Sequence, residues 1–313
     1  MMQPSYFAIP LGCLLVLIVV TNICVCLLVY TYNSLRTFTN GLVVSLAVSD
    51  ILTGALVLPL YITVPAFPGT NYIVSVVMLT GIANQCAVTL DRYLAIKRPF
   101  IYHTVMEKHF WKLIAASWVI PIAISLIPLS FDSEKSLEYR IYLFLLQGLC
   151  VIVPYIFVFV AYYQIFQQAR IIVKRIRRES SLSWRSEKKK TARSNDASSE
   201  AKVAKMFAVI AITFILSWMP VIYLTSVLAA TKDEELLRLL SPVWLIDASL
   251  FTIALGSMVN PVIYSFFKPD FRRILKKLLR KATQKRKQKY PSFNVSLIVS
   301  RLESGKDGRE TDL

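Results

Sequence analysis

Residues 70–96 read TNYIVSVVMLTGIANQCAVTLDRYLAI, an apolar stretch that ends in the charged triplet Asp91-Arg92-Tyr93. The stretch is long enough to cross a bilayer, because a spanning helix needs about 20 mostly apolar residues. An arginine at the centre of such a helix costs roughly 3 kcal/mol on insertion scales, so charges held beside a span are paired, interfacial or functional. We therefore expect a transmembrane helix with the triplet at its inner end, and we favour a signalling role for the arginine.

Stretches of the same kind occur along most of the chain. Apolar residues make up 55% of the 313 residues, which a water-soluble domain could not carry without exposing large apolar patches. The predicted spans cover residues 6–31, 39–64, 70–96, 110–129, 140–168, 202–229 and 241–266. The sequence thus predicts an all-α fold, a bundle of seven transmembrane helices.

Basic residues are distributed unevenly between the connections. If the N-terminus lies outside, the inner side holds all but four of the 36 lysines and arginines, and the outer four are Lys135, Arg140, Lys232 and Arg238. Inner loops carry the excess of Lys and Arg, so we predict a multi-pass plasma-membrane protein with an extracellular N-terminus and a cytoplasmic C-terminus. A net charge of +17 could also indicate nucleic-acid binding, but a solvated inner face drawn to anionic membrane lipid accounts for most of it.

The chain after the last span divides into two parts. Residues 269–281 have an apolar face opposite a basic face, the pattern of an amphipathic helix on the inner membrane surface. The apolar positions are Phe271, Ile274, Leu275, Leu278 and Leu279. We therefore divide the chain into a seven-span domain at 1–268, a surface helix at 269–281 and a flexible cytoplasmic tail at 282–313.

Two short motifs lie on the predicted inner side. Ser180 follows Arg177-Arg178-Glu179, which is similar to a basophilic-kinase site where phosphate would add negative charge beside arginines. The terminal residues Thr311, Asp312 and Leu313 resemble the Thr-x-Leu carboxylate that PDZ domains bind as an added strand. Phosphorylation of Ser180 and a PDZ partner are therefore hypotheses for the inner face.

Polar residues inside the spans are few, and several share one depth. Asp50 in the second span lies level with Asn22 in the first and with Ser257 and Asn260 in the seventh. A carboxylate at that depth is costly unless it meets amides, water or a cation, so these residues could form a sodium site. The alternative is a protonated Asp50 that only holds helices together.

Span 6 and the inner ends of the bundle carry a second set of candidates. Trp218-Met219-Pro220 places a bulky ring beside a helix turn in which the proline removes a backbone hydrogen bond. Glu200, near the inner mouth, could pair with Arg92, and such an ion pair is better suited to a switch than to stability. Tyr162 and Tyr264 could offer hydroxyls to the arginine once it is released.

The ordered set of these motifs resembles the rhodopsin-like (class A) G-protein-coupled receptors over essentially the whole chain. The matching residues are Asn22, Val25, Leu46-Ala47-Val48-Ser49-Asp50, Asp91-Arg92-Tyr93, Trp118, Pro154, Tyr162, Phe214, Trp218, Pro220, Asn260-Pro261-Val262-Ile263-Tyr264 and Phe271. The resemblance implies a receptor rather than an enzyme. An agonist would move span 6 outward and open an inner cavity for a heterotrimeric G protein or arrestin. Pro154, Ile82 and Phe214 would form the repacking core between ligand and cavity.

The resemblance also places a ligand pocket at the outer end. Its positions fall on Val74, Val77, Met78, Leu146, Gln147, Cys150, Trp218, Val221, Ile222, Leu250 and Ala254. Val74 stands where amine receptors have an aspartate, and Ala254 where visual pigments have the retinal lysine. This apolar pocket indicates a small neutral or lipophilic ligand, oriented by Tyr61, Gln147, Thr225 or Asp247. A small-amine or nucleoside receptor of the same family is the alternative.

Some residues depart from the pattern of that family. All five cysteines fall inside predicted spans, so the usual disulfide at the outer end of span 3 cannot form. Gly81 stands where the family often has a serine in the sodium shell, which counts against sodium. Gln85 stands among residues that normally seal span 3 against span 6, and a buried amide there could recruit water and raise basal activity.

Two other classes of membrane protein fit less well. A seven-span hydrolase needs a metal or nucleophile cluster at membrane depth, but the two histidines, His103 and His109, fall in the predicted second inner loop. A transporter needs polar residues along one pore, whereas the acids here gather at the inner half. We therefore expect no cofactor other than a sodium ion as modulator.

Overall fold

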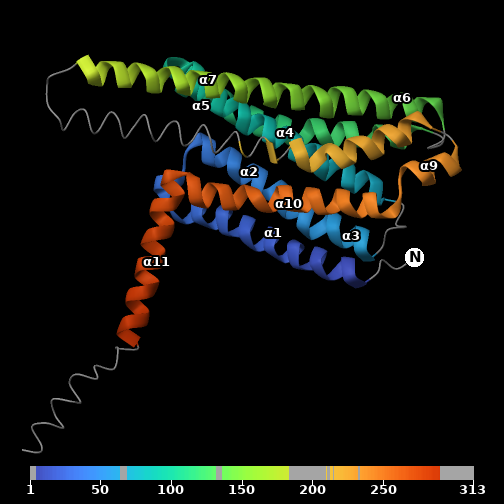
Figure 1. Ribbon diagram of the computed structural model, residues 1–313, viewed down its shortest axis with the longest axis horizontal. Helices are drawn as coiled ribbons and strands as arrows, with labels where there is room; N and C mark the ends of the chain where they lie inside the picture. The colour runs from blue at the N-terminus through green and yellow to red at the C-terminus, as the bar shows by residue number, and fades with distance from the viewer. Residues whose placement is uncertain are drawn as a thin grey trace, which may run out of the picture.

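The structure is a computed structural model that describes residues 5–63, 69–131, 136–182, 209, 212–213, 215–231 and 233–289. Within these ranges the chain is helical and contains no strand, as predicted. The long helices run side by side as one bundle, with the N-terminus and α9 (Glu234–Leu240) at one end (Figure 1). The helix α11 (Pro269–Lys289) leaves the opposite end at a steep angle to the bundle axis (Figure 1).

The crossing helices follow the predicted order. They are α1 (Ser5–Thr31), α2 (Phe38–Leu52) with α3 (Leu58–Thr63), α4 (Thr70–Lys97), α5 (Pro99–Leu126), α6 (Leu137–Leu145) with α7 (Val153–Leu182), the helix Ile215–Ala230, and α10 (Val243–Phe267). Six crossings of the described chain are long and apolar enough to span a membrane, and Ile215–Ala230 is a shorter apolar helix. Residues 202–208 of the predicted sixth span lie outside the described ranges.

Two crossings contain a π-helical turn just before a proline. Thr53–Val57 joins α2 to α3 ahead of Pro59, and Leu146–Ile152 joins α6 to α7 ahead of Pro154. A proline lacks the N–H that an α-helix needs and crowds the preceding turn, so a wider turn accommodates it. Both π turns therefore mark places where the side chains shift around the helix axis.

Three helix ends differ from the predicted boundaries. α5 begins at Pro99, not at 110, because Arg98 breaks the helix and proline suits a first helical position. The predicted second inner loop is therefore helical, and His103 and His109 lie on α5. α11 continues to Lys289, past the predicted end at 281, and α7 continues to Leu182, which is the helical extension that we expect beyond the apolar span ending at 168. Apolarity marks where a helix leaves the bilayer, not where the helix itself ends.

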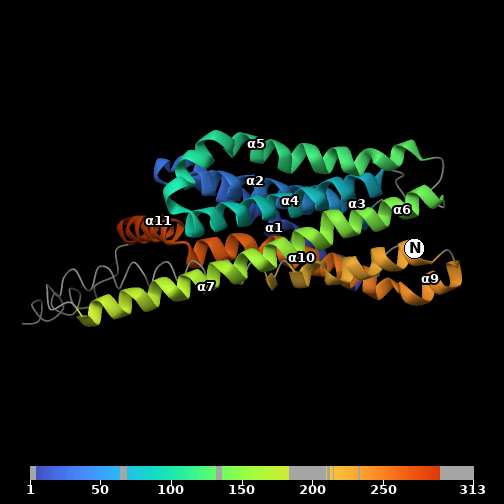
Figure 2. The same cartoon turned by 90° about the horizontal axis from the view of Figure 1, so that it is seen from above.

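Polar side chains join three helices in the middle of the bundle. Ser45 on α2 donates to Asn84 Oδ1 on α4 at 2.6 Å, and Ser117 on α5 donates to the same oxygen at 3.2 Å. Trp118 Nε1 on α5 donates to Ser45 Oγ at 2.9 Å. Such bonds link helices where lipid provides no hydrophobic drive for their association. The central helix α4, which lies between α5 and α7, is thereby held in register (Figure 2).

Candidate functional site

A cavity of about 380 Å³ lies in the half of the bundle nearest the N-terminus. Its walls come from α3, α4, α6, the π turn at Leu146–Ile152, the helix Ile215–Ala230 and α10. Its apolar lining includes Val57, Val74, Met78, Leu79, Leu143, Leu146, Val151, Trp218, Val221, Ile222, Leu250 and Ile253. None of the described residues that line it is Asp, Glu, Lys, Arg or His. We call this space the outer cavity.

Hydroxyl and amide groups supply the polarity of the outer cavity. Gln147 Nε2 donates to the Ile222 carbonyl at 3.0 Å and to Ser226 Oγ at 2.5 Å, so it also links the π turn to the helix Ile215–Ala230. Ser75 donates to Ser125 at 3.0 Å across α4 and α5. The cavity thus combines apolar walls with neutral hydrogen-bonding groups, as small-molecule sites do.

Most of the predicted pocket residues line the outer cavity. These are Val74, Met78, Leu146, Gln147, Trp218, Val221, Ile222 and Leu250, together with Tyr61 and Thr225. Val77 instead faces a deeper cavity, and Cys150 faces a groove on the outside of the bundle. Ala254 is fully buried in a cluster with Leu11 and Ile18 of α1. Asp247 is not among the residues that line the outer cavity.

Several lining residues were not predicted from the sequence. Tyr72, Ser75, Tyr139, Tyr142 and Ser249 border the outer cavity. The tyrosines of α6 belong to an aromatic cluster, in which the Phe131 and Tyr142 ring centroids are 5.9 Å apart. Aromatic residues recurring at the start of a span are a signal that could have identified this wall.

A clasp at the same end was also not predicted. Arg140 on α6 donates from Nε to the Ala229 carbonyl at 3.0 Å and from a terminal nitrogen to the Ala230 carbonyl at 2.9 Å. These carbonyls end the helix Ile215–Ala230, where a cation also interacts favourably with the helix dipole. All five cysteines are described and free, so this arginine, not a disulfide, braces the cavity mouth.

A second cavity of about 30 Å³ lies deeper in the bundle, which is about the volume of one water molecule. Asp50, Gly81, Gln85, Ser217, Trp218, Ser257 and Asn260 are among its lining residues. Asn260 Nδ2 donates to Asp50 Oδ2 at 3.0 Å, whereas Asn22 donates to backbone carbonyls of Ile18 and Ser257. Asp50, Ser257 and Asn260 are therefore brought together, and Asn22 supports α10 beside them. We call this space the core cavity.

Gln85 places an amide in the core cavity. The residue is 1% exposed, and its Nε2 has no hydrogen-bond partner among the described residues. Leaving a buried donor unsatisfied costs about 1–3 kcal/mol. The side chain therefore favours any arrangement that brings a water or an acceptor to it.

Trp218 and its neighbour connect the two cavities to α10. The Trp218 side chain lines both the outer cavity and the core cavity. Ser217 O accepts a hydrogen bond from Thr252 Oγ1 at 2.8 Å. A Cβ on Gly256 would lie 2.7 Å from Ser217 Oγ, so glycine is needed for this approach of α10 to the helix Ile215–Ala230. Pro220 follows two residues after Trp218, and the helix lacks one backbone donor there.

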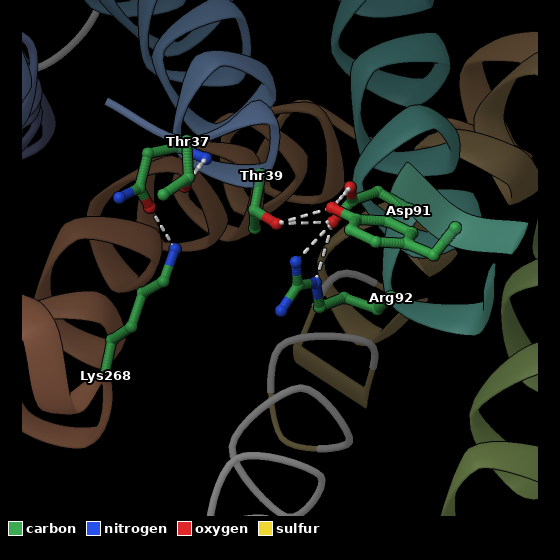
Figure 3. Close-up of polar contacts among 7 residues, drawn as sticks. Thr37, Thr39, Asp91, Arg92 and Lys268 are labelled. Carbon is green, nitrogen blue, oxygen red and sulfur yellow. Dashed lines mark hydrogen bonds and ion pairs between the residues drawn. The ribbon is translucent and has the colours of Figure 1, made fainter. Parts of the chain in front are cut away.

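Asp91 is the centre of a polar cluster near the α11 end (Figure 3). Its Oδ2 accepts from Thr39 Oγ1 at 2.8 Å, from Arg92 Nε at 2.8 Å and from an Arg92 terminal nitrogen at 2.6 Å. Its Oδ1 accepts from the Tyr102 hydroxyl at 2.7 Å. The carboxylate is fully buried and the arginine side chain is 16% exposed. Arg92 is thus held beside its own neighbour on α4, with α2 and α5 completing the cluster.

Of the residues predicted to pair with Arg92, the structure describes the side chain of Tyr162 and not those of Tyr264 and Glu200. Thr89 Oγ1 lies 3.4 Å from the buried Tyr162 hydroxyl, and Tyr93 donates to Gln164 Oε1 at 3.3 Å. Glu200 and Phe214 lie outside the described residues, as does the side chain of Tyr264. Ser180, Thr311, Asp312 and Leu313 also fall on side chains or segments outside them. Ile82 packs in one cluster with Trp218, and Pro154 lines the outward groove.

A buried lysine joins the surface helix to the bundle. Lys268 lies between α10 and α11, beyond the last apolar span, and is 6% exposed. Its Nζ donates to Asn40 Oδ1 on α2. In Figure 3, Lys268 lies apart from Asp91 and Arg92. Burial lowers the pKa of Lys268 to about 7, and the Arg92 guanidinium acts in the same direction. Sequence reasoning missed this contact.

Comparison with known proteins gives the same architecture. Residues 21–264 match the family model of the 7 transmembrane receptors of the rhodopsin family. The chain belongs to this family. Its relatives include the adenosine receptor A2a of Homo sapiens, 27% identical over 95% of this chain and 77% of that receptor. A D(5)-like dopamine receptor of Takifugu rubripes is 29% identical over 86% and 66%, and trace amine-associated receptor 7c of Rattus norvegicus is 27% identical over 83% and 78%.

As a member of this family, the receptor is a multi-pass membrane protein that transduces signals and is not an enzyme. Its partners are a small-molecule ligand and a heterotrimeric G protein. The outer cavity, the core cavity and the Asp91 cluster lie in order from the N-terminal end of the receptor to its α11 end. A continuous protein path therefore joins the two cavities to the Asp91 cluster.

Proposed function

We propose that the receptor binds an uncharged small ligand in the outer cavity. The observation that supports this most directly is the lining, in which the described residues include no acid or base. A protonated amine moved into such a cavity would lose its hydration without gaining a counter-ion, which is costly. An uncharged ligand loses less, and it can bond Gln147 and the surrounding hydroxyls.

The apolar walls favour a lipophilic ligand, whereas the neutral polar groups also favour a nucleoside. The relatives named for adenosine support the nucleoside alternative, and those named for dopamine and trace amines support an amine. The missing counter-ion ranks the amine last. The ligand classes therefore differ by measurable chemistry, namely charge and hydrogen-bonding capacity.

A ligand panel tests this proposal. Neutral lipids, nucleosides and small amines would be applied to cells expressing the receptor with several G-protein reporters. We expect an uncharged agonist whose potency falls about tenfold or more in Gln147→Leu, because the cavity loses its amide. Phe159→Ala serves as the control, since Phe159 is exposed on the outside of α7. Activation by a permanently charged ammonium compound alone would contradict the proposal.

We further propose that Arg92 leaves Asp91 on activation and then contacts the G protein. The arginine is paired at 2.6 Å with the buried Asp91 carboxylate of its own helix and is itself 16% exposed, so a side-chain rotation can bring it toward the α11 end. Arg92→Gln is expected to lower agonist-stimulated guanine-nucleotide exchange while the receptor still reaches the cell surface. Unchanged exchange at equal surface expression would reject this role.

We propose that the N-terminus is extracellular and that α11 lies on the cytoplasmic membrane surface. The positive-inside distribution of lysine and arginine supports the orientation, and the steep exit of α11 from the bundle supports its surface position (Figure 1). An epitope tag at the N-terminus of intact cells should bind antibody, whereas one after Leu313 should require permeabilisation. The reverse pattern would refute the orientation.

Three finer interactions remain proposals. The core cavity has the size and the carboxylate for a sodium ion held by Asp50, Ser257 and Asn260, although Gly81 contributes no oxygen. Sodium should then lower agonist affinity in the parent receptor and not in Asp50→Asn. Arrestin would bind after phosphorylation of Ser180, and a pull-down of arrestin with Ser180→Ala tests this. A PDZ domain would bind Thr311, Asp312 and Leu313, and a pull-down with Leu313 deleted tests that.

A further inference from the structure

A hollow of about 380 Å³ runs along one side of α11. The described residues that line it are five bases and one amide, namely Arg273, Lys276, Lys277, Arg280, Lys281 and Gln284. Steps of three and four residues connect these positions, so they share one face of the helix over about 16 Å at 1.5 Å per residue. We call this face the basic stripe.

The basic stripe faces away from the apolar face of α11. With 3.6 residues per turn, the centre of the stripe lies roughly 160° around the helix from the centre of the five apolar positions. Phe271 and Ile274 of the apolar face are buried against the bundle, at 1% and 8% exposure. A helix on a membrane surface turns its apolar face toward the acyl chains and its opposite face toward water. The stripe is therefore directed to the aqueous phase and not to lipid headgroups.

Charge repulsion along the stripe is not relieved within α11. The helix contains ten Lys and Arg and a single acid, Asp270. Asp270 lies 3.4 Å from Arg273 at the start of the helix, so it neutralises only that end. Further along, Lys277 and Lys281 are four residues apart, a spacing at which like charges destabilise a helix. An acidic segment laid along the stripe would remove this repulsion.

The sequence after α11 contains such a segment. The tail from residue 290 onward lies outside the described residues, and its four acids all fall in residues 303–313, which we call the acidic segment. These acids are Glu303, Asp307, Glu310 and Asp312. Lys306 and Arg309 lie between them, so the segment would be held by separate ion pairs and not by a uniform charge. We propose that the acidic segment docks on the basic stripe of the same receptor molecule.

The connecting chain is long enough to turn back. Pro291 follows two residues after the end of α11 at Lys289, and proline cannot continue a hydrogen-bonded helix. The fourteen residues from Lys289 to Glu303 can span up to about 46 Å, whereas the far end of the stripe at Arg273 lies about 24 Å back along the helix. No apolar stretch long enough to cross a membrane follows α11, so the acidic segment and the stripe share one side of the membrane.

The connection through the chain allows weak ion pairs to hold the segment. Each exposed pair contributes little by itself. A flexible connection of this length gives the segment an effective concentration of about millimolar at the stripe, so several weak pairs act together. The acidic segment includes Thr311, Asp312 and Leu313, so its docking competes with a PDZ domain for the same residues. The docking itself depends neither on that domain nor on the ligand or the G protein.

Energy transfer within single receptors tests the docking. Full-length receptor would be placed as one molecule per nanodisc of phosphatidylcholine, which excludes contacts between copies. Noncanonical amino acids would carry a donor dye at Ser300 and an acceptor dye at Arg272, which is exposed and does not line the stripe. The transfer efficiency is expected to be at least twofold higher in 0.1 M than in 1 M NaCl, because salt at 1 M screens charges beyond about 3 Å. Equal efficiency at the two salt concentrations would overturn the proposal.

Matched variants separate the stripe from the overall charge of the receptor. Lys276→Gln with Lys277→Gln removes two charges from the stripe and should lower the efficiency in 0.1 M NaCl to near its value in 1 M. Lys108→Gln with Lys112→Gln removes two charges from α5 and should leave the efficiency at the parent value. All four lysines are exposed, so both pairs should fold, and melting temperatures check this. Equal losses in the two pairs would refute docking on the stripe.

Neutralising the acidic segment tests the other partner. Glu303→Gln, Asp307→Asn and Glu310→Gln together should lower the efficiency as the stripe variant does. Combining them with Lys276→Gln and Lys277→Gln should lower it no further, because groups that interact with each other are not additive. Additive losses would show that the two sets act separately. Loss of transfer when phosphatidylserine replaces phosphatidylcholine would assign the stripe to lipid headgroups and overturn the proposal.

Discussion

Replacement of Lys268 by methionine should remove a pH dependence from the stability of the receptor. Burial lowers the pKa of this lysine from an ordinary 10.5 to about 7. Each pKa unit corresponds to about 1.4 kcal/mol, so a buried charged Lys268 costs the folded state up to about 5 kcal/mol. The cost is largest below pH 7, where the folded protein must keep the proton, and it declines as the pH rises from about 7 toward 10.5.

The parent receptor should therefore become more stable between pH 7 and pH 9. Lys268→Met has no proton to lose, so its melting temperature should be higher at pH 6.5 and should vary less over the same range. Unfolding would be followed by thermal fluorimetry of purified receptor in detergent at pH 6.5, 7.5 and 9.

Lys276→Met is the control for this experiment, because Lys276 lies on the exposed face of α11, the helix that begins directly after Lys268. It should follow the parent curve at every pH. Parallel curves for the parent and Lys268→Met would show that Lys268 titrates alike in the folded and unfolded states, and would refute the reasoning from burial.

Three other variants test contacts that the structure shows. Gln85→Leu removes an unsatisfied buried amide, so it should lower basal signalling and raise stability by about 1–3 kcal/mol, measured by reporter assay and thermal unfolding. Equal basal signalling would reject a loosened core. Arg140→Ala removes two bonds to helix-end carbonyls and should speed ligand dissociation several-fold, with Arg238→Ala as an exposed control. Gly256→Val would meet Ser217 Oγ, so it should lower surface expression and thermal stability, and a stable variant would show that the helices can separate there.

The spans were predictable because hydrophobic length alone identifies a membrane helix. The inner boundary of α5 was not predictable in this way, because charged and histidine residues interrupt the apolar residues from Pro99 to Lys112, and the helix there begins after Arg98 with Pro99. The triplet at Asp91 was predictable as a site, but the two residues of other helices that donate hydrogen bonds to the Asp91 carboxylate were not. Thr39 and Tyr102 are distant in sequence, and nothing in their local pattern marks them as partners of a buried carboxylate.

The pocket illustrates the same limit at the level of single side chains. Alignment to a family pattern assigns Cys150 to the ligand wall, yet this residue of the π turn from Leu146 to Ile152 lines the groove on the outside of the bundle. Ala254 was assigned to the same wall, but α1 covers it. The contact between Lys268 and Asn40 joins residues 228 positions apart, so only the folded bundle reveals it.

The position of Trp218 between two cavities has a consequence for what kinds of ligand the receptor can distinguish. The outer cavity presents no fixed charge among its described residues, so a ligand cannot act there by neutralising one. It can act by volume, by pressing on an indole whose other side borders a space the size of one water molecule. Agonists and antagonists of this receptor should then differ more in depth and bulk than in polarity. Hydrostatic pressure, which penalises internal voids, should shift the balance between active and inactive states.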